Sequence, residues 1–384
     1  MNGTDVTIRT QQLNKLFSYG KRTALEDSRL EIIPCRFTQE EGAGEIREFQ
    51  RGLHTADFCP VTDDCIQENN SFVYPVFAPE RKERHEKAII LLHGLNERSW
   101  EKYLAWAEYL AWAAGKPVIL FPIAFHMNRT PPQWSNPRAA TPWAAKRRQA
   151  IEGLCNATFV NVALSDRISR QPLRFYASGR ESAYNLCQLA GEIKTGRHPL
   201  FREDASVNLF AYSIGSLLSQ VLLLANPGGL FSGARLFMFC GGSIFNHMDG
   251  NARDILDKEA FDRLQAYFNG DFLERRNLPA AFRNDSLEQA FKAMIRPEVM
   301  KGFRESFFEK ACARIRAVSL KKDVVVPTAG IIKALGRASS VILEEVDFPY
   351  PYSHQTPFPL SPKIEAPLIN NAFRTVFSRA AAFL

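Results

Sequence analysis

The stretch Val207-Asn-Leu-Phe-Ala-Tyr-Ser-Ile-Gly-Ser216 decides the fold class, because it joins a buried strand to a helix through a very short turn. Val207 to Ala211 is an apolar run typical of a buried strand, and Leu217 to Leu224 has a helical pattern. Ser213 stands between them. Such a turn needs small residues two positions on either side of the serine, strains its backbone and exposes its Oγ above the sheet. We therefore predict that Ser213 is a nucleophile; the alternative is a serine that only caps the helix.

Short apolar runs alternate with helical patterns on both sides of this turn. A buried strand at 88–92 precedes a helix that ends at Gly115, and further strands are expected at 72–77, 118–121, 236–240, 317–320 and 341–346. Strand, helix and strand in succession form right-handed crossover units. The sequence therefore predicts an α/β fold with a mostly parallel central sheet and helices on both faces.

The expected domain organisation is an N-terminal extension at 1–70 followed by one domain at 71–384. Two segments interrupt the alternation. The segment at about 122–180 is rich in proline and reads as an irregular insertion that shapes a pocket. The segment at about 246–310 reads as an inserted helical cap, with Asp285 and Glu288 in the spacing of a capping box.

A second candidate motif, His93-Gly94-Leu95-Asn96, directly follows the strand at 88–92. Loops at the carboxyl ends of parallel strands carry ligand contacts in open α/β sheets. The backbone N–H groups of Leu95 and Ile214 are therefore candidate donors to an oxyanion. The alternative is an ordinary glycine-containing turn with His93 hydrogen-bonded beneath the site.

With LLHG as an oxyanion-loop signature and AYSIGS as a nucleophile elbow, the chain resembles the α/β-hydrolase superfamily. The family's order of nucleophile, acid and histidine then points to Asp323, in Lys322-Asp-Val-Val-Val-Pro327, and to His354, in FPYPYSHQ. The resemblance implies a Ser213, His354 and Asp323 triad with the Leu95 and Ile214 amides as oxyanion hole. The sequence departs from the family at Ala211, where the family usually has glycine.

Competing assignments remain open at this point. Asp249 is a rival acid, and His126 and His247 are rival histidines, because each follows an expected strand. Arg129, Trp134, Arg138 and the cluster Lys146-Arg147-Arg148 are candidates for binding an acidic or carbohydrate-bearing ester, although a solvated charged loop is the simpler interpretation. No substrate-binding residue follows from the sequence.

The predicted function is that of a serine hydrolase, esterase- or lipase-like, which acts on a carboxylic ester of a small molecule without metal or organic cofactor. One alternative is a catalytically silent protein of the same fold that binds a ligand or partner. Another is an acyltransferase that uses the same nucleophile. The sequence specifies neither the substrate nor the oligomeric state.

Composition excludes several other classes of protein. The 384 residues are 46% hydrophobic and 23% charged, as in globular proteins, and no apolar stretch is long enough to span a membrane. Lys and Arg (48) exceed Asp and Glu (41) by 7, but the charges are interleaved and no nucleic-acid motif accompanies them. The N-terminus lacks the pattern of a secretory signal, and the 7 cysteines include no C-x-x-C pair. We therefore expect a cytoplasmic protein with reduced thiols, and the Cys59 and Cys65 pair is too weak to predict a metal site.

Overall fold

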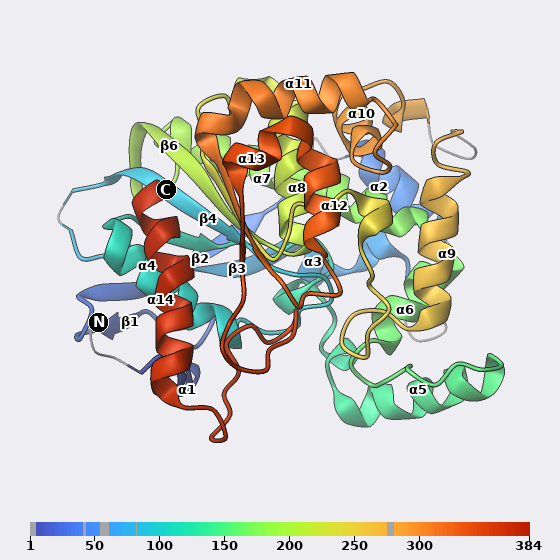
Figure 1. Cartoon of the computed structure of the whole chain (residues 1–384), viewed down its shortest axis with the longest axis horizontal. Coiled ribbons are helices and arrows are strands. Elements are labelled where there is room, and N and C mark those ends of the chain that lie inside the picture. The colour runs from blue at the N-terminus through green and yellow to red at the C-terminus, as the bar shows by residue number, and fades with distance from the viewer. Residues whose placement is uncertain (1–4, 41–43, 54–60, 82, 275–279) are drawn as a thin grey trace.

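The computed structural model describes residues 5–40, 44–53, 61–81, 83–274 and 280–384. Its strands form one nine-stranded sheet in the order β1-β2-β3-β5-β4-β6-β7-β8-β9 (Figure 1). The strands are β1 (Thr23–Leu25), β2 (Leu30–Thr38), β3 (Ser71–Pro79), β4 (His85–Leu92), β5 (Val118–Leu120), β6 (Phe201–Tyr212), β7 (Leu236–Phe239), β8 (Ile315–Leu320) and β9 (Leu343–Val346).

Strand direction divides the sheet into two parts. The six strands from β5 to β9 in the sheet order pair in parallel, whereas β1, β2 and β3 pair antiparallel to their neighbours, as β3 does to β5. From β4 the chain passes through α4 to β5 on one side of β4. It then returns to β6 on the other side of β4. The prediction of a mostly parallel sheet is confirmed.

Two layers of helices cover the sheet, one on each face (Figure 1). One layer consists of α1 (Val6–Leu16), α4 (Glu101–Ala114) and α14 (Ala366–Phe383). The other includes α7 (Leu173–Lys194), α8 (Ile214–Ala225), α10 (Ser286–Ala293), α11 (Lys301–Ala311) and α12 (Thr328–Leu335). The remaining α-helices are α2 (Gly44–Arg51), α3 (Gln67–Asn70), α5 (Pro137–Ala150), α6 (Val162–Arg170), α9 (Lys258–Asn269) and α13 (Ser339–Ile342).

The central strands send alternate side chains into two separate cores. In β6, Leu209 and Ala211 join the core beneath α7 and α8, whereas Phe210 and Tyr212 join the core beneath α4 and α14. This alternation follows from the two-residue repeat of a strand. Because both faces are buried there, the carboxyl-terminal parts of β4 (88–92) and β6 (209–212) are continuous apolar runs instead of alternating with polar residues.

The expected N-terminal extension contributes to the same sheet, since β2 pairs with β3 from Leu30 and Pro79 to Thr38 and Ser71. The boundary at residue 70 therefore separates strands that are hydrogen-bonded to each other.

The segment at 122–180 is more regular than expected, because it contains α5, α6 and the start of α7, joined by irregular chain at 122–136 and 151–161. Its prolines are compatible with a helix: Asn136 caps α5 and Pro137 occupies the first turn, where no N–H is needed. Pro142 lies one turn further on, within the same helix. The segment packs beside α9 at one end of the molecule (Figure 1).

The described part of the segment at 246–310 contains α9, α10 and most of α11, with non-helical chain at 248–257 and 294–300. A variant of the expected capping box is present: the Asp285 carboxylate accepts the Glu288 N–H at 2.7 Å, and Glu288 accepts the N–H of Asn284, the residue before the cap. α10 packs on α8, the helix that follows Ser213.

Candidate active site

Ser213 lies at the carboxyl end of β6, in the turn that begins α8. Its φ of 55° and ψ of −122° are outside the regions that side-chain-bearing residues normally adopt. The turn is so tight that a Cβ on Gly215 would lie 2.8 Å from the Leu92 carbonyl oxygen. Glycine is therefore required at 215, whereas Ala211, in the middle of the sheet, fits its position as a fully buried residue. The local sequence thus places Ser213 in a strained turn above the sheet.

Two loops from distant parts of the chain bring His354 and Asp323 to this serine. The His354 Nε2 lies 2.7 Å from Ser213 Oγ, and its Nδ1 lies 2.7 Å from Asp323 Oδ2. All three side chains are buried. Asp323 follows β8 and His354 lies in the loop after β9, so the hydrogen-bonded chain runs across three strand ends.

The second carboxylate oxygen of Asp323 fixes the acid's orientation. Asp323 Oδ1 accepts hydrogen bonds from the backbone N–H groups of Val325 and Val326, both at 2.9 Å. The Asp323 N–H also donates to Leu320 at 3.0 Å. Oδ2 is consequently the oxygen directed at His354.

The rival residues lie elsewhere. Asp249 is exposed, and its carboxylate accepts the Asn251 N–H at 2.9 Å. His247 is exposed as well. His126 is buried, with its Nδ1 2.9 Å from the carbonyl of Ala124, and burial lowers its pKa to about 4. None of the three side chains takes part in the hydrogen bonds around Ser213.

The two amides expected to form an oxyanion hole have free N–H groups, since neither Leu95 nor Ile214 donates a hydrogen bond to any described residue. His93 lies beneath this loop. Its Nε2 accepts the Ile123 N–H at 2.9 Å, so the proton is on Nδ1, which faces the carbonyl of Gly94 at 2.8 Å. Complete burial lowers the pKa of His93 well below its usual value. His93 is therefore a neutral support for the loop.

Sequence reasoning missed a set of supporting residues around the site. The Tyr212 hydroxyl donates to the His354 carbonyl, and the two rings stack with centroids 5.4 Å apart. The Gly94 N–H donates to the Tyr103 hydroxyl at 3.0 Å, which donates to Glu97 at 2.9 Å. Tyr103 belongs to the apolar stripe of a helix and Tyr212 to the variable position of the turn motif, so neither carried a recognisable signal.

Ser213 and His354 line an open, polar cleft of about 450 Å³. The loop at 94–99 forms one wall, and residues from the loops at 135, 160 and 254 complete it. Lys102 bridges two of its edges, because it forms an ion pair with Glu97 and donates to the carbonyl of Gln355 at 3.1 Å.

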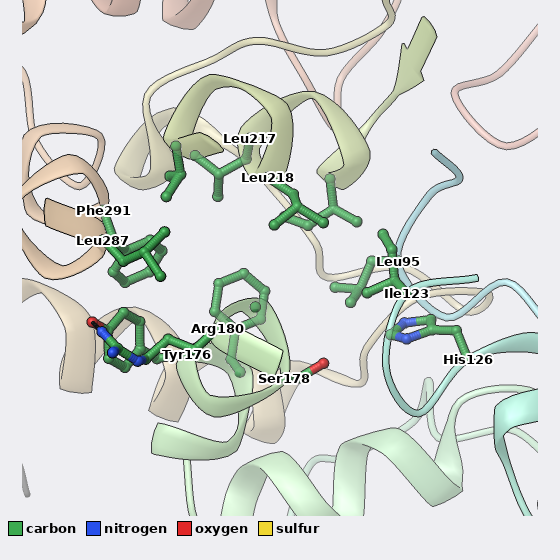
Figure 2. Close-up of a pocket in the computed structure, with 14 residues that line it drawn as sticks. Leu95, Ile123, His126, Tyr176, Ser178, Arg180, Leu217, Leu218, Leu287 and Phe291 are labelled. Carbon is green, nitrogen blue, oxygen red and sulfur yellow. Dashed lines mark hydrogen bonds between the residues drawn. The ribbon is translucent and has the colours of Figure 1, made fainter. Parts of the chain in front are cut away.

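A narrower, apolar chamber of about 70 Å³ lies behind the serine turn, between α7, α8 and α10 (Figure 2). Leu217 and Leu218 form one wall, and Leu287 and Phe291 close one end. Leu95 and Ile123 stand at the other end, and Leu95 also lines the polar cleft. The two compartments therefore adjoin at Leu95; Ser213 lines the polar one, and the next residue, Ile214, lines the apolar one.

Arg129, one of the candidates for binding substrate, is part of the interior. Arg129 is fully buried and donates to Asn69, Asn185 and the Glu181 carboxylate, and burial lowers its pKa to about 10. Arg147 forms a two-point ion pair with the buried Asp257, which joins α5 to α9. Trp134 is also buried, whereas Arg138 is exposed. Arg129 and Arg147 therefore fit neither interpretation, since they belong neither to a substrate-binding group nor to a solvated charged loop.

Within the described ranges, no three His, Cys, Asp or Glu side chains are grouped as metal ligands require. Cys59 lies outside those ranges, so its pairing with Cys65 is not addressed. No helix in the described part of the chain has the length and apolar character needed to cross a membrane.

The sheet order and the strained serine turn, with an acid after β8 and a histidine after β9, define a protein of the α/β-hydrolase fold. The chain belongs to the family of unknown function DUF6051, whose model matches residues 12–384. No match was found among curated proteins.

Several solved esterases are similar in structure. A thermostable esterase from Pseudomonas putida is 10% identical, with 99% of this chain and 91% of that chain covered and a TM-score of 0.47. Carboxyl esterase 2 from the fungus Tuber melanosporum is 9% identical, with 98% and 97% covered and a TM-score of 0.44. A hyperthermophilic esterase from Pyrobaculum calidifontis is 12% identical, with 100% and 91% covered and a TM-score of 0.40.

Proposed function

We propose that this protein is a serine hydrolase that cleaves a carboxylic ester through Ser213, His354 and Asp323. The observation that carries the proposal is the position of the His354 imidazole, which lies 2.7 Å from Ser213 Oγ on one side and 2.7 Å from Asp323 on the other. These are hydrogen-bond distances suited to proton transfer.

In this reaction, Ser213 Oγ attacks the ester carbonyl while His354 Nε2 accepts the hydroxyl proton. The imidazolium that forms lies against Asp323, whose charge stabilises it without accepting the proton. The N–H groups of Leu95 and Ile214 donate to the oxyanion of the tetrahedral intermediate. His354 then protonates the departing alcohol, and water cleaves the acyl-serine by the same route in reverse.

The test is labelling with a fluorophosphonate probe, followed by mass spectrometry of the modified peptide, because the probe reacts with activated serines and not with ordinary ones. We expect an adduct on Ser213 that is lost in Ser213→Ala and in His354→Ala. Ser99→Ala is the matched control, since Ser99 lines the same cleft without a histidine partner. It should be labelled like the wild type.

Failure of the folded wild-type protein to react with the probe or to hydrolyse any ester in a panel would refute the proposal. It would leave the fold as a scaffold for ligand or partner binding. Acyl transfer is distinguished from hydrolysis by adding an alcohol or amine acceptor: a transferase forms the acylated acceptor in preference to the free acid.

A further inference from the structure

The two compartments beside Ser213 differ in the chemistry that they offer to the two halves of an ester. Ten of the 14 residues that line the chamber are apolar, and two of its polar members have hydrogen-bond partners, although Arg180 Nε and His126 Nε2 are buried without one. The Ser178 hydroxyl donates to a backbone carbonyl at 3.0 Å, and Arg180 is paired with Asp285. The chamber therefore offers an ester mainly apolar contacts.

This difference sets the orientation of the substrate, an argument that rests on the proposed hydrolase function. Apolar surface is more stable out of water, so the acyl chain belongs in the chamber and the alcohol belongs in the polar cleft. A volume of about 70 Å³ is roughly half that of a 150 Å³ cavity that takes up benzene, which limits the acyl group to a short aliphatic chain.

Arg98 is the unusual residue of the cleft. Its side chain is half-buried, and its guanidinium lies 5.5 Å from the centre of the Phe159 ring. Within the described part of the chain it makes no hydrogen bond and no ion pair, and its Nη1 is shielded from water without an acceptor. Desolvation lowers its pKa, although Asp254 and Glu97 are near enough to act in the opposite direction.

A shielded guanidinium nitrogen without an acceptor is costly, because its N–H groups lose hydration and gain no hydrogen bond in return. The other cation of the cleft, Lys102, is already paired with Glu97. The same wall of the cleft therefore holds Lys102, which has an ion-pair partner, and Arg98, which has hydrogen-bond donors without acceptors. Guanidinium groups bind carboxylates and phosphates through paired hydrogen bonds.

We propose that Arg98 binds an anionic group, a carboxylate or a phosphate, on the alcohol half of the ester. The substrate class is then a short-chain acyl ester of an anionic alcohol. Arg98 acts as a specificity residue: it contacts the leaving group and takes no part in the proton transfers at Ser213.

The test uses pairs of esters that differ in charge and little else. The butyrate ester of para-hydroxybenzoate is compared with that of methyl para-hydroxybenzoate, and butyrylglycerol phosphate is compared with butyrylglycerol. In the wild type we expect kcat/KM to favour the anionic member of at least one pair by roughly tenfold or more, as expected for hydrogen bonds to a charged group. The pair that shows the preference identifies the anion as carboxylate or phosphate.

Arg98→Gln should remove this preference while the neutral esters are hydrolysed at rates within about threefold of wild type, and Arg98→Lys should retain part of it. Arg337→Gln is the matched control, because Arg337 is exposed on another part of the surface. Added salt should weaken the preference in the wild type but not the rate on neutral esters.

The outcomes separate this inference from the proposed function. Ser213-dependent hydrolysis of all four esters with no preference for charge, or a preference that survives in Arg98→Gln, would overturn the role of Arg98 and leave the hydrolase intact. Absence of both probe labelling and hydrolysis would overturn the hydrolase, and this inference with it.

Discussion

Replacing Asp323 by asparagine tests the proposed triad most sharply, because the structure fixes how the new amide must lie. Asp323 Oδ1 accepts two backbone N–H groups, and only an oxygen can replace it there. The amide NH₂ is then directed at His354 Nδ1, which must accept a hydrogen bond. The proton of a neutral imidazole consequently moves to Nε2, and the base that faces Ser213 is lost.

The opposite orientation of the amide would set an NH₂ group against the N–H groups of Val325 and Val326. Leaving two buried donors unsatisfied costs about 1–3 kcal/mol each, so the harmful orientation dominates. The expected loss in kcat is about 10⁴-fold, or roughly 5.5 kcal/mol of transition-state stabilisation, with little change in KM.

The assay is steady-state hydrolysis of a short-chain ester, with the rate of fluorophosphonate labelling as a second measure and thermal unfolding as the control for folding. Asp249→Asn is the matched variant, since Asp249 is the exposed rival acid, and it should retain wild-type activity. The reasoning is refuted if folded Asp323→Asn keeps more than about a tenth of the wild-type activity, or if Asp249→Asn is the variant that loses it.

Four further predictions follow from the structure. Gly215→Ala should lose both probe labelling and thermal stability, because its Cβ would lie 2.8 Å from a backbone oxygen; wild-type labelling would show that the turn is looser. Arg129→Gln should lower the free energy of unfolding in urea by about 3–5 kcal/mol, because it leaves the Glu181 carboxylate buried and unpaired. Phe291→Ala should shift the preferred acyl chain from butyrate toward octanoate by enlarging the chamber; an unchanged chain-length profile would contradict this. Burial lowers the pKa of His198 to about 4, so stability should fall as pH drops from about 6.5 to 4, by about 3 kcal/mol from this residue, with a shallower dependence in His198→Gln.

The fold could be predicted from local pattern because its decisive signals are short and contiguous. A buried parallel strand reads as an apolar run, and the turn at Ser213 has a compact signature of small residues. The segment at 122–180 was harder, because its prolines suggested irregular chain. Pro137 in fact occupies the one part of a helix where a missing N–H costs nothing.

The candidate site was predictable to the extent that chain order reflects position in the sheet. Asp323 and His354 follow successive strands, so their loops emerge at the same edge as Ser213. The buried ion pairs were not predictable, because partners such as Arg129 and Glu181 are far apart in sequence and a charged residue in a loop reads as solvated. Arg98 was overlooked for a related reason: sequence shows that a cation is present but not that it lacks a partner.

The described histidines near the site differ in a way that supports the proposal of His354 as the general base. A general base becomes a cation during the reaction, and that charge must be stabilised where water is scarce. Burial lowers the pKa of both His93 and His126, and the nearby Arg129 guanidinium lowers it further, so their surroundings oppose protonation. Among the described histidines, His354 is the one in contact with a carboxylate. Proximity to the site does not distinguish the three histidines, because His126 borders the chamber and His93 lies beneath the loop that carries Leu95. The Asp323 carboxylate distinguishes His354 from the other two histidines. It lies in the loop after β8, and His354 lies in the loop after the next strand, β9.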